Sequence, residues 1–276
     1  MIRHVWAAGL ALAAIAAVAA PAHAGTTFSQ DFETDTSGWT DSSNGWYGSV
    51  TRVASGTGGI TSAGGSWHAI FDGDSSSAPF TNFGGYSSVW PGTYSASVDI
   101  YLDTSWAAGS GFDYTVASSR QTGAHLRDFI FHVTQDTSTG ELLVAGSNNT
   151  NFAVRQDLEN INHYSVTNSG WYTFEHVFYD DGSGVLAVDL NLRDSNGTLL
   201  FTETRSDAGD LIASVVGGNR YGWFTFIDVR DGIAVDNTCL GTPVAAVPLP
   251  PAALLGMGML GGLGLIARRR RRAQIA

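Results

Sequence analysis

The sequence contains no lysine and a single cysteine, and between its two ends it shows hardly any helix-period pattern. All 14 basic residues are arginine, and Cys239 has no second cysteine with which to form an internal disulfide. A fold built on disulfides is therefore excluded, and a mainly helical fold is disfavoured. Stability has to come from a hydrophobic core, with a bound metal ion as a further source.

The N-terminal residues predict a signal peptide. Arg3 precedes an apolar run over residues 5–20, and Ala22-His23-Ala24 supplies the small-x-small pattern that signal peptidase cleaves. We expect residues 1–24 to be removed, so that the mature protein starts at Gly25.

The C-terminal residues form a second unusual segment. Val247, Pro248, Leu249 and Pro250 are followed by an apolar run over residues 252–267 and by the arginines Arg268, Arg269, Arg270, Arg271 and Arg272. This order resembles PEP-CTERM sorting tails of the VPLPA type. The resemblance implies processing by exosortase, a membrane-embedded protease-transpeptidase of Gram-negative bacteria. One departure is Pro251, where this variant more often has alanine.

Physical arguments also place this tail in the inner membrane, at least transiently. The apolar run of 16 residues is short against the roughly 20 that usually span a bilayer. Snorkelling arginines extend it, and the positive-inside rule keeps them cytoplasmic. We expect a linker and sorting motif over 243–251, a hydrophobic helix over 252–267 and a basic cytoplasmic tail over 268–276. An ordinary membrane anchor is the alternative.

The segment between the two ends, residues 25–242, is strongly acidic. It contains eight arginines and all 25 acidic residues, which gives it a formal charge of −17. Such a surface repels nucleic acid and anionic lipid, and it favours divalent cations. We expect no nucleic-acid partner.

Residues 25–242 predict one all-β domain. Leu186, Val188, Leu190 and Leu192 alternate with polar residues, as in a strand with one wet face. Similar segments cover 94–102, 127–134, 171–179, 223–229 and 233–240. Turns at 180–184 and 194–197 predict three consecutive antiparallel strands between Trp171 and Phe201. We expect a single two-sheet antiparallel β-sandwich, with a jelly roll and a Greek key both open as strand orders.

Two short segments resemble concanavalin A-like domains and β-sandwich carbohydrate-binding modules. They are Phe28 to Glu33 with Gly38-Trp39 near the start, and Ile233 to Asn237 near the end. The resemblance implies a structural calcium ion held by Glu33 and Asp236, with Asp31 and backbone carbonyls nearby. The alternative is that these acids face solvent on edge strands.

The sequence contains no recognisable catalytic motif. HExxH, Gly-x-Ser-x-Gly and glycine-rich phosphate loops are missing, and no serine has an evident base beside it. A laminarinase-type glucanase would carry two glutamates around an aspartate on one strand, whereas the five glutamates here are far apart. Glu175 and His176 are adjacent, so on a strand they point to opposite faces. We expect a protein that is not an enzyme.

Aromatic residues near glycine-rich loops are candidates for sugar binding. Aromatic rings stack on the apolar faces of sugars, and neighbouring polar groups bind the hydroxyls. The first candidate is the predicted loop over 217–223, with Arg220, Tyr221 and Trp223; further candidates are Trp46, Tyr47 and Trp90. The alternative is that these rings fill the core.

The sequence thus predicts an exported, exosortase-processed protein of the cell surface, outer envelope or extracellular matrix. An extracellular polysaccharide is the expected partner of its domain. The alternatives are an enzyme that acts on exopolysaccharide, as a glycoside hydrolase or lyase, and a structural matrix or adhesion protein.

The export prediction can be tested in the native cell. We expect mass spectrometry of the mature protein to find Gly25 as its first residue, because cleavage follows Ala24. Recovery of the intact domain in the cytoplasmic fraction would contradict the prediction.

Overall fold

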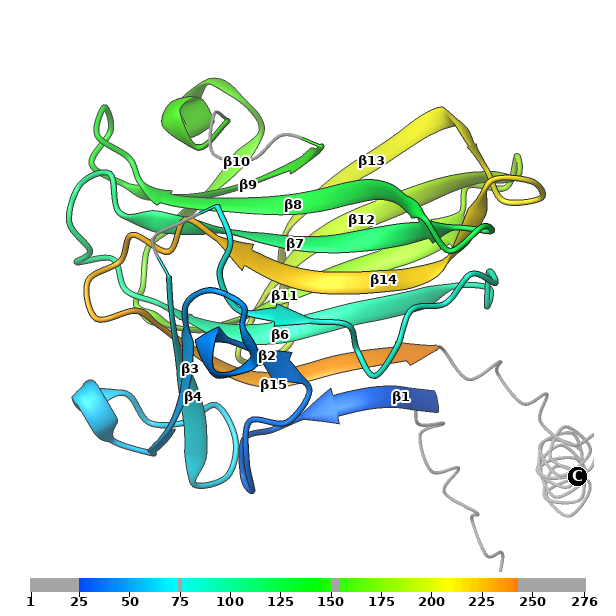
Figure 1. Cartoon of the computed structure of the whole chain (residues 1–276). Coiled ribbons are helices and arrows are strands. Elements are labelled where there is room, and N and C mark those ends of the chain that lie inside the picture. The colour runs from blue at the N-terminus through cyan, green and yellow to red at the C-terminus, as the bar shows by residue number, and fades with distance from the viewer. Residues whose placement is uncertain (1–24, 74–75, 150–153, 243–276) are drawn as a thin grey trace, which may run out of the picture. The chain divides into compact units, whose positions relative to one another are not determined.

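Antiparallel strands in two layers make up most of the described chain (Figure 1). The structure is a computed structural model that describes residues 25–73, 76–149 and 154–242. The first layer, sheet A, has eight strands among these residues. Their order is β13 (Leu199–Leu211), β12 (Val185–Asp194), β11 (Gly170–Asp180), β6 (Tyr94–Leu102), β15 (Ile233–Thr242), β4 (Trp67–Asp72) and β3 (Ser49–Ala54), with β1 (Gly25–Gln30) paired to β15.

The second layer, sheet B, has seven strands within the described residues. Their order is β10 (His163–Val166), β9 (Leu142–Asn148), β8 (His125–Gln135), β7 (Gly111–Arg120), β14 (Val216–Thr225), β5 (Phe80–Thr81) and β2 (Trp39–Thr40). The 3-10 helices of the described chain are η1 (Ser42–Asn44), η2 (Thr57–Gly59) and η3 (Val154–Asn160). Leu158 of η3 packs with Leu143 and Ala145 on the outer side of sheet B.

The predicted two-sheet antiparallel β-sandwich is confirmed. Strand β6 has the predicted bounds, and β11, β12 and β13 are consecutive antiparallel neighbours. The two predicted hairpin turns close through backbone bonds. The Asp181 amide donates to the Val185 carbonyl, and the Asp194 amide donates to the Thr198 carbonyl. Period-two alternation was sufficient here because one face of each strand is buried.

The predicted loop over 217–223 is wrong, because these residues belong to strand β14. Its glycines permit close approach of neighbouring chain. A Cβ atom on Gly217 would lie 2.6 Å from the Arg120 carbonyl oxygen, and one on Gly222 would lie 2.7 Å from Cζ of Phe83. The pairing of β14 with β7 is also irregular on both sides of Asn219, as expected for a glycine-rich strand with bulges.

Aromatic rings from the two sheets interleave to form the core. Phe174 of β11 lies 5.0 Å from Phe131 of β8, and Phe71 of β4 lies 5.3 Å from Phe224 of β14. His176 is fully buried among these rings, and its Nε2 lies 3.1 Å from the Phe129 carbonyl oxygen of the opposite sheet. Burial lowers the pKa of His176 to about 3, so this imidazole is neutral and Nε2 can donate.

Several predicted segments lie outside the described residues. They are the leader over 1–24, the linker with Val247 to Pro250, the apolar run over 252–267 and the arginines from Arg268 onward. Among the residues that the structure does describe, no helix has the length and apolar character needed to cross a membrane.

Two strand-opening glycines provide a matched stability test. A Cβ atom on Gly111 of β7 would collide with the Val133 carbonyl, whereas one on Gly170 of β11 would meet nothing within 4 Å. We expect Gly111→Ala to lower the free energy of unfolding by about 1–3 kcal/mol, because the core has to shift to accept the methyl group. Gly170→Ala should change it little. Urea unfolding of both variants measures the difference, and equal stabilities would contradict the described packing.

Candidate functional site

A row of rings runs along the outward face of sheet B. Alternation on β14 turns Phe224 into the core and Tyr221 and Trp223 outward, and Trp223 pairs across to Phe80 of β5. Ring centroids are 5.1 Å apart between Trp46 and Phe80, and 5.4 Å between Phe80 and Tyr221. His125 stacks nearly parallel to Tyr221 at 6.0 Å. We call Trp46, Phe80, Tyr221, Trp223 and His125 the aromatic row.

Polar groups border the aromatic row at Tyr221. Its hydroxyl donates to Asp128 Oδ1 over 2.9 Å, and Nε2 of His125 lies 3.1 Å from the same oxygen. Burial, followed by the charge of Asp128 and the bond to it, raises the pKa of Tyr221 well above its ordinary value. The Tyr221 hydroxyl therefore stays protonated and oriented at neutral pH.

Arg220, the neighbour of Tyr221 on β14, is a further polar group at the border of the aromatic row. Its Nη1 donates to the Gly123 carbonyl, and its guanidinium carbon lies 4.6 Å from the ring centre of Tyr86. A guanidinium over an exposed ring is a cation–π contact, and its remaining N–H groups suit hydroxyl or carboxylate oxygens. Arg220 thus presents a planar donor beside the aromatic row.

The structure brings together only part of the predicted ligand set. Trp46, Tyr221 and Trp223 belong to the aromatic row, and Arg220 borders it. Tyr47 follows Trp46 and is 61% exposed. Trp90 lies elsewhere, where it packs against the core with its ring 5.6 Å from Tyr94. Phe80 and His125 were missed in the sequence, because their place in the row depends on the pairing of β5 with β14 and on the β7–β8 hairpin.

The predicted calcium ligands bind backbone amides instead of forming a carboxylate cluster. Glu33 Oε1 accepts from the amides of Ser66 and Trp67, and Asp236 Oδ2 accepts from the amide of Gly64. Asp31 is exposed and accepts from the Glu33 amide. The first and last strands are thus connected through the same 64–67 turn by hydrogen bonds.

These residues do not fit a calcium site. Calcium takes six to eight oxygen ligands, whereas amide N–H groups here already bond to one oxygen each of Glu33 and Asp31 and to both oxygens of Asp236. Arg52 also donates to the backbone carbonyls of Phe32 and Glu33, so these two oxygens already have a positively charged donor. Over the described residues, no group of three or more His, Cys, Asp or Glu side chains is arranged to hold a metal ion.

A buried Asp–His–Ser line on sheet B was missed in the sequence. Nδ1 of His132 lies 2.8 Å from Asp113 Oδ1, and its Nε2 lies 2.6 Å from Ser147 Oγ. Asp113 and His132 pair directly across β7 and β8, so the position of that hairpin turn would have predicted their contact. The carboxylate, imidazole and hydroxyl follow one another in the same order as in the catalytic triad of a serine nucleophile. All three side chains are buried, however, and Ser147 is only 7% exposed.

Comparisons with known proteins give structural likenesses only. No family model and no curated protein matches the chain. The CBM2 module of the evolved Dit protein of Lactobacillus casei BL23 phage J-1 is 13% identical, with 81% of this chain and 98% of that chain covered and a TM-score of 0.45. A legume lectin-like domain from Entamoeba histolytica is 11% identical, with 81% and 100% covered and a TM-score of 0.44.

A third structure is a carbohydrate esterase from the Shiga toxin-encoding bacteriophage phi24B. It is 13% identical, with 80% of this chain and all of that chain covered, and its TM-score is 0.40. Likenesses at this level carry no information on what this chain binds. Its function therefore has to be argued from its own residues.

Asp236 gives a testable pH dependence. Burial, together with the charge of Asp99, raises its pKa to about 6, although backbone amides of Gly64 and Asn237 act in the opposite direction. The folded protein therefore binds a proton between pH 3.8 and 6 that the unfolded chain does not. The resulting stability is fully present below pH 3.8 and is lost as the pH rises through 6, by up to about 3 kcal/mol.

Urea unfolding between pH 3.5 and 7 measures this dependence. This range begins roughly 0.3 units below the pKa of the unfolded chain and ends roughly one unit above that of the folded protein. We expect Asp236→Asn to remove the decrease and Asp31→Asn, a change of an exposed acid, to leave it in place. An unchanged slope in Asp236→Asn would contradict the raised pKa.

Proposed function

We propose that this chain is an exported, exosortase-processed protein whose β-sandwich, residues 25–242, binds an extracellular polysaccharide without cleaving it. The observation that carries the binding proposal is the aromatic row on the outward face of sheet B, bordered by Asp128 and Arg220. The export proposal rests on the order of residues at the two chain ends. Together these observations support a location at the cell surface or in the extracellular matrix.

The chemistry of the row suits a sugar chain. Half-exposed rings in line offer apolar faces to successive sugar rings, and the neighbouring carboxylate and guanidinium can bind hydroxyls. The formal charge of −17 over residues 25–242 disfavours polymers rich in uronic acids. A largely neutral polysaccharide is therefore the expected partner.

A polysaccharide pull-down with the full chain tests this proposal. The chain is kept in a detergent that contains no sugar and is incubated with the exopolysaccharide of its own host. We expect Tyr221→Ala to weaken retention about tenfold, because it removes the ring at the centre of the row. Parallel incubations with calcium and with a chelator show whether binding needs the ion.

The matched control is Tyr101→Ala. Tyr101 is a half-buried tyrosine on the outward side of sheet A, where its ring lies 5.7 Å from Trp171. This variant should retain polysaccharide like the original chain. Equal losses in both variants would contradict the assignment of binding to the aromatic row, and no retention of any chain would favour a structural matrix protein.

The Asp113–His132–Ser147 line favours hydrolysis of a polysaccharide substituent as a second candidate function. Its burial argues against substrate access, which is why we place it second. The same incubation distinguishes the two candidates. Release of acyl groups that disappears in Ser147→Ala would establish an enzyme.

A further inference from the structure

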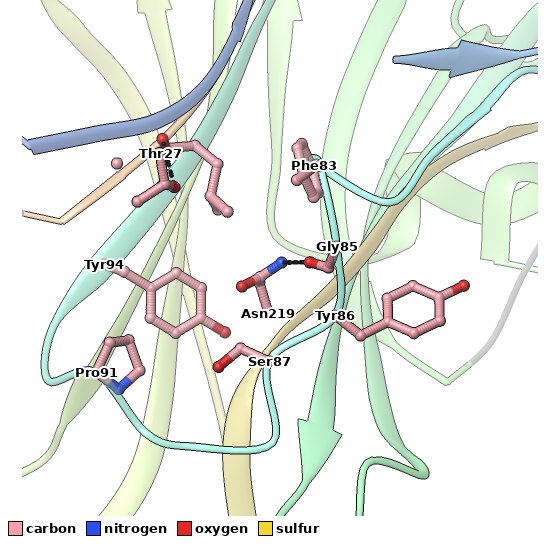
Figure 2. A pocket seen from close by; sticks show the side chains of 11 residues that line it. Thr27, Phe83, Gly85, Tyr86, Ser87, Pro91, Tyr94 and Asn219 are labelled. Carbon is pink, nitrogen blue, oxygen red and sulfur yellow. Dashed lines mark hydrogen bonds between the residues drawn. The ribbon is translucent and has the colours of Figure 1, made fainter.

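A pocket of about 360 Å³ lies next to the aromatic row, where the ends of several strands meet (Figure 2). One wall of the pocket is the segment between β5 and β6. Two backbone hydrogen bonds fix this segment against β14. The Ser87 amide donates to the Asn219 carbonyl, and the Gly218 amide donates to the Ser87 carbonyl. The volume is within the usual range for small-molecule sites.

The pocket contains a buried hydroxyl without a partner. Tyr94 lines it and is only 2% exposed, yet its phenol makes no hydrogen bond. One face of the Tyr94 ring stacks on Phe178 at 4.5 Å, which holds the phenol in this position. Buried polar groups are nearly always satisfied, and an unmade bond is costly. Burial also raises the pKa of the Tyr94 phenol, which leaves it protonated and able to donate.

Two further polar side chains are held in place around this phenol. Nδ2 of Asn219 donates to the Gly85 carbonyl over 3.0 Å, which orients the amide, and Figure 2 shows its oxygen on the side toward Tyr94. The Ser87 hydroxyl donates to the Val89 carbonyl and can still accept a bond. Donor and acceptor groups thus converge on one small volume.

The rest of the lining is apolar and uncharged. Phe83, Pro91 and Leu240 contribute apolar surface, and none of the lining residues is acidic or basic. A charged ligand would therefore lose its hydration without meeting a counter-ion among the lining residues. Arg220 lies outside this lining, where the Gly123 carbonyl and the Tyr86 ring hold its guanidinium. The lining suits a neutral ring that carries both C–H faces and hydroxyls.

The pocket and the aromatic row adjoin each other. Asn219 lines the pocket, and the next residue, Arg220, borders the row. Tyr86 lines the pocket and also lies under the Arg220 guanidinium. If a sugar chain lies along the aromatic row, the sugar unit that follows at the Arg220 end therefore lies beside the pocket.

From this geometry we propose that the pocket binds one neutral pyranose residue, with the Tyr94 hydroxyl and the Asn219 amide as its hydrogen-bonding groups. This inference rests on the proposed polysaccharide binding and adds its specificity, because the pocket would select neutral residues over uronic acids.

Saturation-transfer NMR on the full chain tests the pocket with single sugars. The probes are methyl glycosides of the common neutral hexoses, pentoses, 6-deoxyhexoses and N-acetylhexosamines, together with methyl glucuronoside as the charged counterpart. We expect at least one neutral glycoside to bind and the glucuronoside not to bind. Tyr94→Phe should weaken the binding about fivefold, the effect of losing one neutral hydrogen bond.

Tyr114→Phe is the matched control. Tyr114 is also fully buried with an unpartnered hydroxyl, but its ring stacks on Phe224 in the core and does not line the pocket. We expect this variant to bind the glycoside unchanged. Without sugar, Tyr94→Phe should have a Tm no lower than that of the original chain, because the deleted hydroxyl has no partner to lose.

The outcomes separate this inference from the proposed function. Glycoside binding that survives Tyr221→Ala but weakens in Tyr94→Phe supports the pocket. If no glycoside binds, or Tyr94→Phe and Tyr114→Phe behave alike, the pocket inference is overturned, while retention of polysaccharide through Tyr221 still stands. If neither polysaccharide nor glycoside binds, both are overturned.

Discussion

The pairing of the last strand, β15, in the interior of sheet A is the constraint on which the rest of the sandwich depends. β15 is hydrogen-bonded to β6 on one side and to β4 and β1 on the other, so it joins the first and last segments of the domain. Until β15 is added, sheet A consists of three separate parts: β13-β12-β11-β6, β4-β3 and β1. Such non-local pairing has a high entropic cost and slows folding.

Strand β14 has a similar role in sheet B, because it builds the two candidate sites from neighbouring residues. Its glycines let the Gly84–Pro91 segment approach, and its irregular pairing with β7 changes the direction of the side chains around Asn219. Asn219 consequently faces the pocket, and Arg220 and Tyr221 lie beside or within the aromatic row. One short segment thus sets both the shape and the chemistry of the surface.

Period-two alternation predicted the sandwich and the β11–β12–β13 meander, because a strand with one buried face has a strict pattern. The same reasoning failed for β14. Its glycines are typical of a loop in the sequence, but in the strand they allow neighbouring chain segments to approach closely. Trp46, Tyr221, Trp223 and Arg220 were singled out as candidates because they lie by glycine-rich segments. The positions of Phe80, His125 and Tyr94 depend instead on strand register and on a fold-back segment. Glu33 and Asp236 were recognised as a pair, but the turn whose amides they bind was not foreseeable from spacing.

The position of β15 also has a mechanical consequence. In an antiparallel sheet the hydrogen bonds are perpendicular to the strands, so a force along a strand loads them all at once. Residue Thr242 ends β15 beside Gly25, and the chain continues from there toward the basic tail. A tether that pulls on this end along the strand would therefore shear β15 against β6 and β1 together, and it could not peel the bonds open one by one.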